Sequence, residues 1–357
     1  MNVLLVFLPG LMLLITLINF ITIRRPWNIS QIEETVSILV PLRNEAHNVK
    51  ELLEHLEAQN HLSNATFFFL DDNSEDDTYS KLKEICDRVA NFTLISGSEL
   101  PKGWIGKTWA LQQLLEKSSG EIIVTTDADV RLTPDAISKS IALLNQSQLD
   151  FLSPYPFQEA YTWSEKLIQP LLQWSWFSTV ILRLAEQSSM SSTVVANGQF
   201  FIVRRAALTS IGGYEVVKNR VLDDVALGRE LVKSGSRGGV VDGSKIASTH
   251  MYSSWNEIQS GYGKSLNSAF GTFLGSMSAI AFIFITGIAP LIAGISGSQF
   301  GWFAFALIVL TRAVSAIKVG NTGLAGFLHP IACALLIYLI VYSWLMRGEI
   351  KWKGRTI

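Results

Sequence analysis

The 357-residue sequence is poor in cysteine and in charged residues. Its two cysteines, Cys86 and Cys333, lie far apart in regions of different composition, which excludes a disulfide-stapled scaffold. Charged residues make up 17% of the chain, and residues 1–23 contain none; an average soluble protein has about 25%. The charges between residues 24 and 264 form no basic patch, so no nucleic-acid partner is expected. The sequence therefore indicates a membrane protein with one water-soluble domain.

The N-terminal apolar run, residues 3–23, has the length of a helix that crosses a bilayer. Arg24 and Arg25 follow it directly, and the positive-inside tendency then places the next domain in the cytoplasm. A secretory signal peptide is the alternative, but the run has no basic start and no small-residue cleavage site after it. We predict an N-terminal transmembrane helix within residues 1–25 and a soluble domain over 26–264.

The C-terminal region, residues 265–357, is also apolar. Residues 265–311 carry no charge and are long enough for two spans, with turn residues at 294–298. A third apolar stretch, residues 327–346, ends at Arg347. Three full crossings would put the basic tail outside, against the positive-inside tendency, unless one segment is re-entrant or interfacial. We therefore expect two to three helices followed by a short basic tail.

Residues 36–156 alternate short apolar runs with helical patterns. The runs cover residues 36–42, 66–70, 92–96 and 121–126, and the helical patterns cover 47–59, 77–89 and 107–118. This alternation predicts an α/β domain with a parallel sheet that helices cover on both faces. Ligands of such sheets bind beyond the carboxyl ends of the strands, so the polar residues after each run are candidates for a site. No Gly-x-Gly-x-x-Gly follows a strand and no Walker A sequence occurs, which argues against a dinucleotide or P-loop protein.

Asp127 and Asp129 follow the fourth run. Residues two apart in an extended segment face the same side, so both carboxylates can address one Mg²⁺ or Mn²⁺ ion. The structural alternative is a turn, or a cap for the helix that begins near Pro134. The position of the pair, directly after a buried strand, favours the metal site.

Two other strand ends carry candidate binding residues. Asp72 can accept hydrogen bonds from a base or a ribose, whereas Ser74 and Asp77 are typical of a helix cap. Lys107 begins a predicted helix, where a cation opposes the helix dipole, and this indicates an anionic partner such as a diphosphate. A solvated lysine is the alternative at that position.

Three further features are compatible with more than one role. Asp223 and Asp224 open a helix, either as its cap or as a general base for an acceptor hydroxyl. His250 is a candidate third metal ligand, although a lone histidine is more often structural. The apolar stretch 167–185 is either an ordinary buried helix or an interfacial helix that lines the entry of an apolar acceptor.

In order, the chain contains Pro-x-Arg-Asn-Glu, Asp-Asp-x-Ser-x-Asp-x-Thr, Gly-Lys-x-x-Ala-Leu, Asp-Ala-Asp and a helix opened by Asp-Asp. Over residues 36–235 this series resembles the family 2 glycosyltransferases of GT-A fold. The membrane segments, the Trp-x-Gly-Lys element and the ending Trp-Lys-Gly-Arg resemble a narrower branch with carotenoid (diaponeurosporenoate-type) and hopanoid-associated glycosyltransferases. Polymer-forming members carry Gln-x-x-Arg-Trp after the base, and this chain lacks the Arg-Trp, which argues against a processive synthase.

The resemblance implies a role for each candidate. Around the uridine of a UDP-sugar it places four residues: Pro41, Arg43, Glu45 and Asp72. It implies that Lys107 lies near the diphosphate, that Asp127 contacts the ribose or the metal, and that Asp129 binds the metal. It implies a catalytic base at Asp223 or Asp224, and we favour Asp224.

The expected protein is a multi-pass enzyme of the plasma membrane with a cytoplasmic catalytic domain. It transfers a hexose, with UDP-glucose as the expected donor, to a carotenoid or related isoprenoid with inversion. A polyprenyl-phosphate or hopanoid glycosyltransferase is the alternative enzyme, and an inactive pathway scaffold is the alternative outside enzymes.

Overall fold

The computed structural model describes residues 2–321, 323–346, 351–352 and 355–356. It divides into two compact units, each built from separate stretches of the chain. The sheet unit consists of Arg24–Phe157 and Leu184–His250, and the helical unit consists of Met1–Ile23, Gln158–Arg183 and Met251–Ile357.

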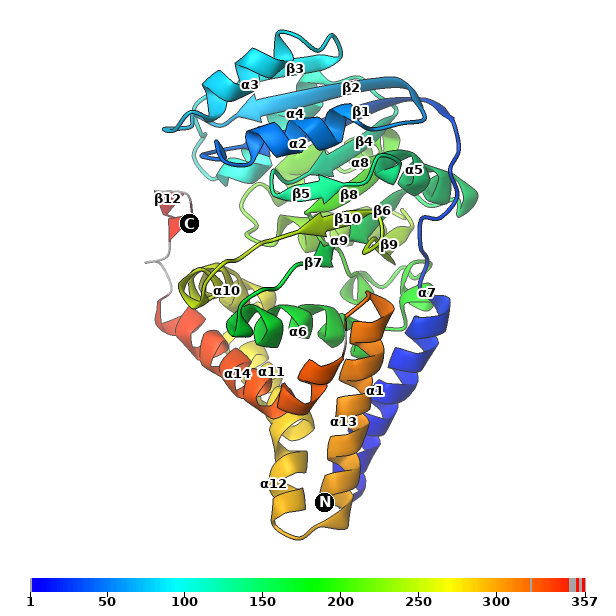
Figure 1. Cartoon of the computed structure of the whole chain (residues 1–357), viewed down its shortest axis with the longest axis vertical. Helices are drawn as coiled ribbons and strands as arrows, with labels where there is room; N and C mark the ends of the chain where they lie inside the picture. Colours follow the sequence, from blue (N-terminus) through cyan, green and yellow to red (C-terminus); the bar gives the residue numbers. More distant parts are fainter. Residues whose placement is uncertain (1, 322, 347–350, 353–354, 357) are drawn as a thin grey trace. The chain divides into compact units, whose positions relative to one another are not determined.

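The sheet unit contains a seven-stranded sheet of order β3-β2-β1-β4-β8-β6-β9 (Figure 1). Four of its neighbouring pairs are parallel, whereas β8 is antiparallel to both β4 and β6. The strands are β1 (Ile32–Leu42), β2 (Leu62–Asp71), β3 (Phe92–Ser96), β4 (Ile122–Thr126), β6 (Phe151–Tyr155), β8 (Phe200–Arg204) and β9 (Gly238–Asp242). The predicted α/β class with a mostly parallel sheet is confirmed, and each of the four predicted strands is present.

The inner strand β1, which pairs with β2 and β4, explains why helices cover both faces of the sheet. Its side chains alternate between two separate apolar cores: Ile38 and Val40 belong to one, and Leu39 belongs to the other. Because successive side chains of a strand point to opposite faces, a strand with buried apolar side chains on both faces requires cover on both sides.

Each core is completed by its own set of helices. The first core takes apolar residues from α2 (Val49–Glu57), α3 (Thr78–Cys86) and α5 (Ala136–Gln146). The second takes them from α4 (Gly106–Lys117), α8 (Arg205–Ser210), the 3₁₀ turn η2 (Gly213–Val217) and α9 (Asp223–Lys233). A smaller sheet of order β5-β10-β7 follows the strand end of β4 and consists of β5 (Val130–Leu132), β10 (Ala247–Thr249) and β7 (Phe157–Gln158).

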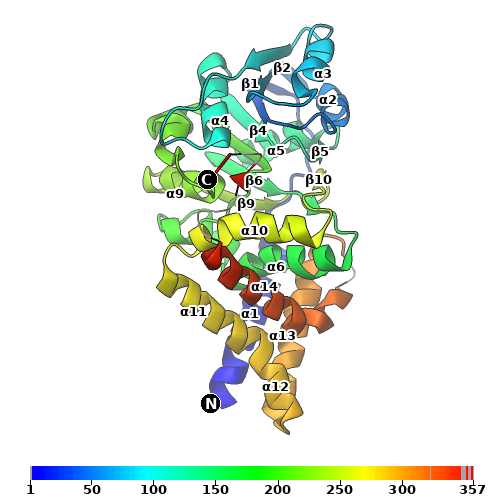
Figure 2. The same cartoon turned by 90° about the vertical axis from the view of Figure 1, so that its left-hand side faces the viewer.

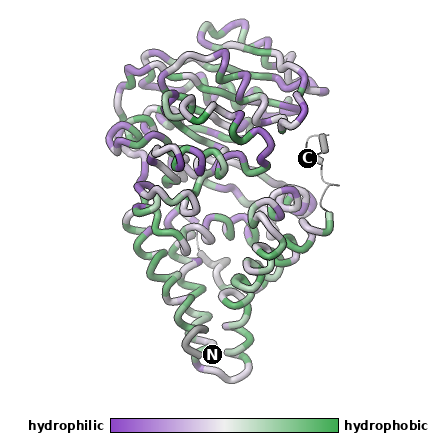
Figure 3. The backbone as a smooth tube through the Cα atoms, turned by 180° about the vertical axis from the view of Figure 1, so that it is seen from behind, coloured by the Kyte–Doolittle hydropathy of each residue, from purple (hydrophilic) through white to green (hydrophobic). Residues whose placement is uncertain are grey.

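Among the residues that the structure describes, the helical unit contains four helices long and apolar enough to cross a membrane, judged by length and composition. They cover residues 5–22, 273–295, 299–318 and 326–345, so three of them follow the sheet unit in the sequence (Figure 2). The tube of this unit is mostly hydrophobic in Figure 3. The corresponding elements are α1 (Asn2–Thr22), α11 (Phe273–Ile283), the π-turn η3 (Phe284–Ile288), α12 (Ala289–Ile295), α13 (Gln299–Lys318), η4 (Leu324–Leu328) and α14 (His329–Leu345).

The boundaries of the units differ from the predicted division at residues 25 and 264. The structure joins α6 (Trp163–Thr179) and α10 (Trp255–Ala269) to the helical unit. The reason is their apolar contact: Leu171 of α6 and Ile258 of α10 are buried in the same core as Leu339 of α14. Within the stretch 167–185, α6 is buried in this core as a helix, and its role as an interfacial helix that lines the entry of an acceptor stays a prediction.

Residues of the first core should dominate the stability of the sheet unit, and Phe69 is a direct test. Its ring is fully buried and its centroid lies 5.0 Å from that of Phe92. We expect Phe69→Ala to lower the free energy of unfolding by about 3–5 kcal/mol, because it leaves a cavity in a packed core. Thermal unfolding of the detergent-solubilised chain measures this. Tyr79→Ala, at a side chain 41% exposed, is the matched control and should change little.

Candidate active site

The candidate site lies at the end of β4. Asp127 and Asp129 follow the strand as predicted, and the Asp127 backbone N–H donates to the Gln199 carbonyl at 3.0 Å. Because β4 pairs antiparallel with β8, with Thr126 opposite Phe200, the residues just before β8 reach the same edge of the sheet. The carboxylates therefore lie beside a polar loop from a distant part of the sequence.

Lys107, in the first turn of α4, forms an ion pair with Asp127, with 2.6 Å between Nζ and Oδ1. Burial disfavours the charged form of this lysine. The negative charges of Asp127, Asp223 and Asp224 outweigh that effect and raise its pKa. The structure thus brings Lys107, Asp127 and the pair at 223–224 together. It also explains why a cation is stable at this helix start despite the helix dipole.

Asp223 and Asp224 occupy the first turn of α9. Burial raises the pKa of Asp223 to about 6, with Lys107 opposing the shift and Asp224 adding to it. Burial also raises the pKa of Asp224. Two adjacent acids with raised pKa values beside a lysine are typical of a site that exchanges protons near neutral pH.

Gly198 is a contact of the site that the sequence analysis missed. Its backbone N–H donates to Asp224 Oδ2 at 2.7 Å. A Cβ at this position would lie 3.2 Å from the Asp224 Cβ and 3.4 Å from the Lys107 Nζ. In the sequence, Gly198 lies between two polar residues, Asn197 and Gln199, directly before an apolar run. This pattern indicates a contact with the site only when β8 is known to begin at the edge of the sheet where β4 ends.

Asp129 lies in a crowded acidic environment. Burial raises its pKa to about 6, and the neighbouring carboxylates of Asp127 and Glu45 add to the shift. Glu45 therefore lies close enough to Asp129 for its charge to act on that carboxylate. His250 follows β10, which pairs with β5 so that Thr249 lies opposite Val130. His250 lies one residue beyond the last paired residue of β10, and Asp129 lies one residue before the first paired residue of β5.

Arg43 and Asp72 form a neighbouring group at the ends of β1 and β2. The Arg43 guanidinium donates to the Asp72 carbonyl at 2.6 Å and to the Asn73 carbonyl at 2.7 Å. Pro41 lies in β1 opposite Leu70 of β2, one residue before the end of each strand. Since β1 also pairs with β4, the two groups stand on adjacent strands of one sheet edge.

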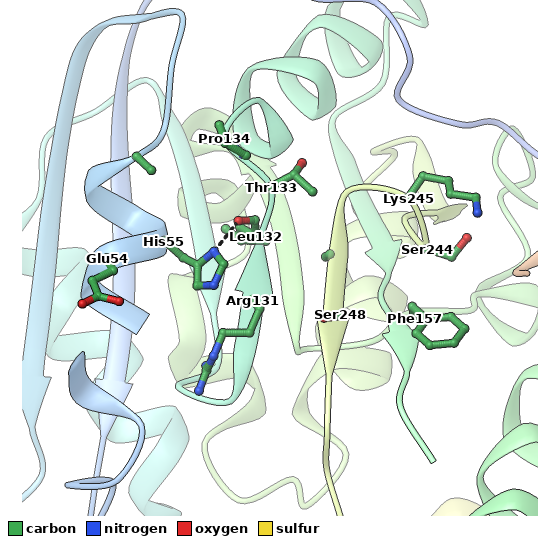
Figure 4. Close-up of a pocket in the computed structure, with 12 residues that line it drawn as sticks. Glu54, His55, Arg131, Leu132, Thr133, Pro134, Phe157, Ser244, Lys245 and Ser248 are labelled. Atoms are coloured by element: carbon green, nitrogen blue, oxygen red, sulfur yellow. Dashed lines mark hydrogen bonds between the residues drawn. The ribbon is translucent and has the colours of Figure 1, made fainter. Parts of the chain in front are cut away.

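A separate groove of about 580 Å³ is lined by α2, β5 and residues near β10 (Figure 4). Its arginine, Arg131, pairs with Glu51 at 2.8 Å and donates to Asn48 at 2.7 Å. His55 contacts the Leu132 carbonyl through Nδ1 at 2.9 Å. Its lining does not include the acids at the end of β4, so the groove is distinct from the candidate site.

The acids at the end of β4 fit a hard divalent cation. Asp127 and Asp129 would supply oxygen ligands, and a cation would relieve the repulsion from Asp127 and Glu45 that, together with burial, raises the Asp129 pKa. Within the part of the chain that the structure describes, no three His, Cys, Asp or Glu side chains group as a metal site. Mg²⁺ in particular is usually held by one or two carboxylates together with water and substrate phosphates.

Curated proteins similar to this chain include two transferases. The 4,4'-diaponeurosporenoate glycosyltransferase of Staphylococcus haemolyticus is 21% identical over 343 residues, which is 90% of this chain and 88% of the relative. The undecaprenyl-phosphate 4-deoxy-4-formamido-L-arabinose transferase of Pseudomonas savastanoi is 32% identical over 114 residues, 31% of this chain and 33% of the relative.

A solved structure shares the fold. The mannosyltransferase PcManGT of Pyrobaculum calidifontis, solved in complex with GDP-Man and Mn²⁺, matches with a TM-score of 0.58 at 17% identity. The match covers 97% of this chain and 98% of that chain. Residues 37–212 match the family described as "Glycosyl transferase family 2", and this segment runs from β1 to just past α8. The chain is therefore a glycosyltransferase of family 2 with a GT-A fold.

Proposed function

We propose that the chain is a membrane-bound, inverting glycosyltransferase that transfers a hexose from a UDP-sugar, with UDP-glucose the expected donor, to a lipid. The proposed acceptor is a carotenoid or related isoprenoid. The observation that carries the proposal is the convergence of Lys107, Asp127 and the Asp223–Asp224 pair at one sheet edge. The proposed location is the plasma membrane, with the sheet unit in the cytoplasm.

The donor would bind along the ends of β1, β2 and β4. Pro41, Arg43, Glu45 and Asp72 would surround the uridine, and Lys107 would bind the diphosphate. A divalent cation, Mg²⁺ or Mn²⁺, would be held by Asp129 and Asp127, with His250 as a possible third ligand, and would neutralise charge on the departing UDP. The Mn²⁺ ion in the Pyrobaculum structure supports the proposal of a divalent cation at this site.

Asp224 would act as the base. Its Oδ2 accepts the Gly198 N–H and its Oδ1 accepts the Val225 N–H, so the carboxylate is held in one orientation. In the reaction it takes the proton of the acceptor hydroxyl while the acceptor oxygen displaces UDP at the anomeric carbon. A single displacement inverts that carbon, and the fixed geometry supplies the alignment.

A polyprenyl-phosphate glycosyltransferase is the second candidate, and the similarity to an undecaprenyl-phosphate transferase favours it. A hopanoid glycosyltransferase is the third candidate, with a hopanoid as its lipid acceptor. Phosphates and carboxylates are largely ionised at neutral pH and need no base, whereas a hydroxyl does. The acids at 223–224 therefore favour a hydroxyl-bearing lipid.

Asp129 tests the reaction class and the metal together. Membranes that contain the wild-type chain, given labelled UDP-glucose and Mn²⁺, should transfer label into the organic-solvent extract. Asp129→Asn should lower this rate about 100-fold or more, because several kcal/mol of charge stabilisation are lost. Asp87→Asn, at an exposed aspartate paired with Lys83, is the control. Equal, metal-independent transfer by the variant would rule out the metal role. The labelled lipid, a glycosylated pigment or a sugar-phosphate lipid, distinguishes the two acceptor classes.

Asp224→Asn should lower transfer to a hydroxyl acceptor about 10²- to 10⁴-fold, the usual contribution of a general base. UDP affinity, measured by titration calorimetry, should change little. Asp223→Asn is the companion variant that shows which acid is the base. If Asp224→Asn weakened UDP binding and left the transfer step intact, the base assignment would be wrong.

Gly198→Ala should lower kcat about 10- to 100-fold with little change in the KM for the donor. The added Cβ crowds Asp224 and Lys107, and a displacement below 1 Å is enough to disturb the alignment. Gly239→Ala in β9 makes the same change where no atom lies within 4 Å of the added Cβ, and it should behave as wild type. Equal effects of the two variants would contradict a positioning role for Gly198.

A further inference from the structure

Arg312 is a buried cation in the helical unit. It lies in α13, one of the four membrane-length helices, and is 4% exposed. A guanidinium carries five N–H donors. Among the described residues, its contact is the face of Trp174, 5.9 Å from the ring centroid, and no side chain or carbonyl accepts a hydrogen bond from it. A charge so far from water normally has a partner, because its desolvation costs several kcal/mol.

The described acids of the helical unit are engaged elsewhere. Glu165 closes the capping box at the start of α6 with Thr162. Glu257 accepts hydrogen bonds from Ser253 at the start of α10. Glu159 accepts one from the Tyr161 hydroxyl at 2.6 Å. None of the three forms an ion pair with Arg312, so its counter-charge does not come from them.

His329 is a second buried polar group beside the same tryptophan. It is fully buried at the start of α14, and its ring centroid lies 4.5 Å from that of Trp174. Its Nε2 contacts Cys333 Sγ at 3.3 Å, whereas its Nδ1 has no hydrogen-bond partner in the described part of the chain. Trp174 itself is fixed by its Nε1–H, which donates to Thr311 at 2.9 Å. We name Arg312, His329 and Trp174 the arginine cluster.

The cluster joins three helices that pack on one another, α6, α13 and α14 (Figure 2). α6 also carries the buried amide of Gln169, and neither of its polar atoms has a hydrogen-bond partner among the residues that the structure describes. Beside His329 the chain exposes large apolar side chains at Phe327, Leu328 and Ile331. Unsatisfied polar groups thus lie next to an apolar surface, a combination that suits a molecule with an ionised head and a hydrocarbon tail.

We propose that the arginine cluster binds the anionic headgroup of a lipid, a phosphate or a carboxylate, with the lipid chain along the apolar start of α14. The planar fork of arginine matches both anions. Ionisable groups within membrane segments are commonly functional, and basic pockets between transmembrane helices bind anionic headgroups. The proposal goes beyond hexose transfer and stands whether or not that function is confirmed.

Native mass spectrometry of the full chain released from nanodiscs tests the site. The discs contain phosphatidylcholine alone, or with phosphatidylglycerol, or with a polyprenyl phosphate. The wild-type chain should retain an anionic lipid, and Arg312→Gln should lower its apparent affinity about 10- to 100-fold, as expected for loss of a charged hydrogen-bond donor. Lys318→Gln, which removes a cation from the end of the same helix, is the matched control and should retain the lipid.

The thermal unfolding midpoint in phosphatidylcholine discs shows whether each variant folds. If Arg312→Gln does not fold, Arg312→Lys keeps the charge without the fork and should bind more weakly than wild type. Retention of polyprenyl phosphate alone identifies an acceptor-like ligand, and retention of both lipids identifies a general headgroup site; either supports the proposal. Equal retention by wild type and the arginine variant, equal loss in Lys318→Gln, or the same stabilisation by free inorganic phosphate would overturn it.

Discussion

The ion pair between Lys107 and Asp127 is the interaction on which the candidate active site depends. Without a cation there, Asp127, Asp223 and Asp224 would repel one another at a partly buried sheet edge. The lysine comes from the start of α4, Asp127 from the end of β4, and the other two acids from α9. The charge of Lys107 therefore stabilises the association of α4 and the end of β4 with α9, which is far from both in the sequence. The same lysine is the group proposed to meet the donor's diphosphate, so donor binding would exchange one anionic partner for another.

Much of the sheet unit could be predicted from the sequence. Local patterns identified the four parallel strands and the helices between them, because strands buried on both faces form short, mostly apolar runs. The residues after those strands, Asp72, Asp127 and Asp129, followed from the rule that ligands bind at carboxyl ends. Strand boundaries shifted: β1 begins at Ile32, four residues before the predicted start.

What the sequence could not predict depends on pairing between distant segments. Gly198 contacts the site only because β8 runs antiparallel to β4 and so begins where β4 ends. No local periodicity specifies the direction of a strand in its sheet. The assignment of α6 to the helical unit has the same origin, since its composition fits a soluble core as well as a membrane-associated one. The roles of the site residues rest on the family resemblance and stay predictions.

The discontinuity of the sheet unit has a practical consequence for anyone who wishes to crystallise it. Residues 158–183 leave that unit and return to it, and within them α6 buries Leu167, Ile168 and Leu171 against apolar helices. A fragment cut at residues 24 and 250 would therefore keep α6 but remove the helices that cover it. That fragment should aggregate in aqueous buffer, because the apolar face of α6 is exposed. Replacing residues 158–183 by a short polar linker should reduce this aggregation.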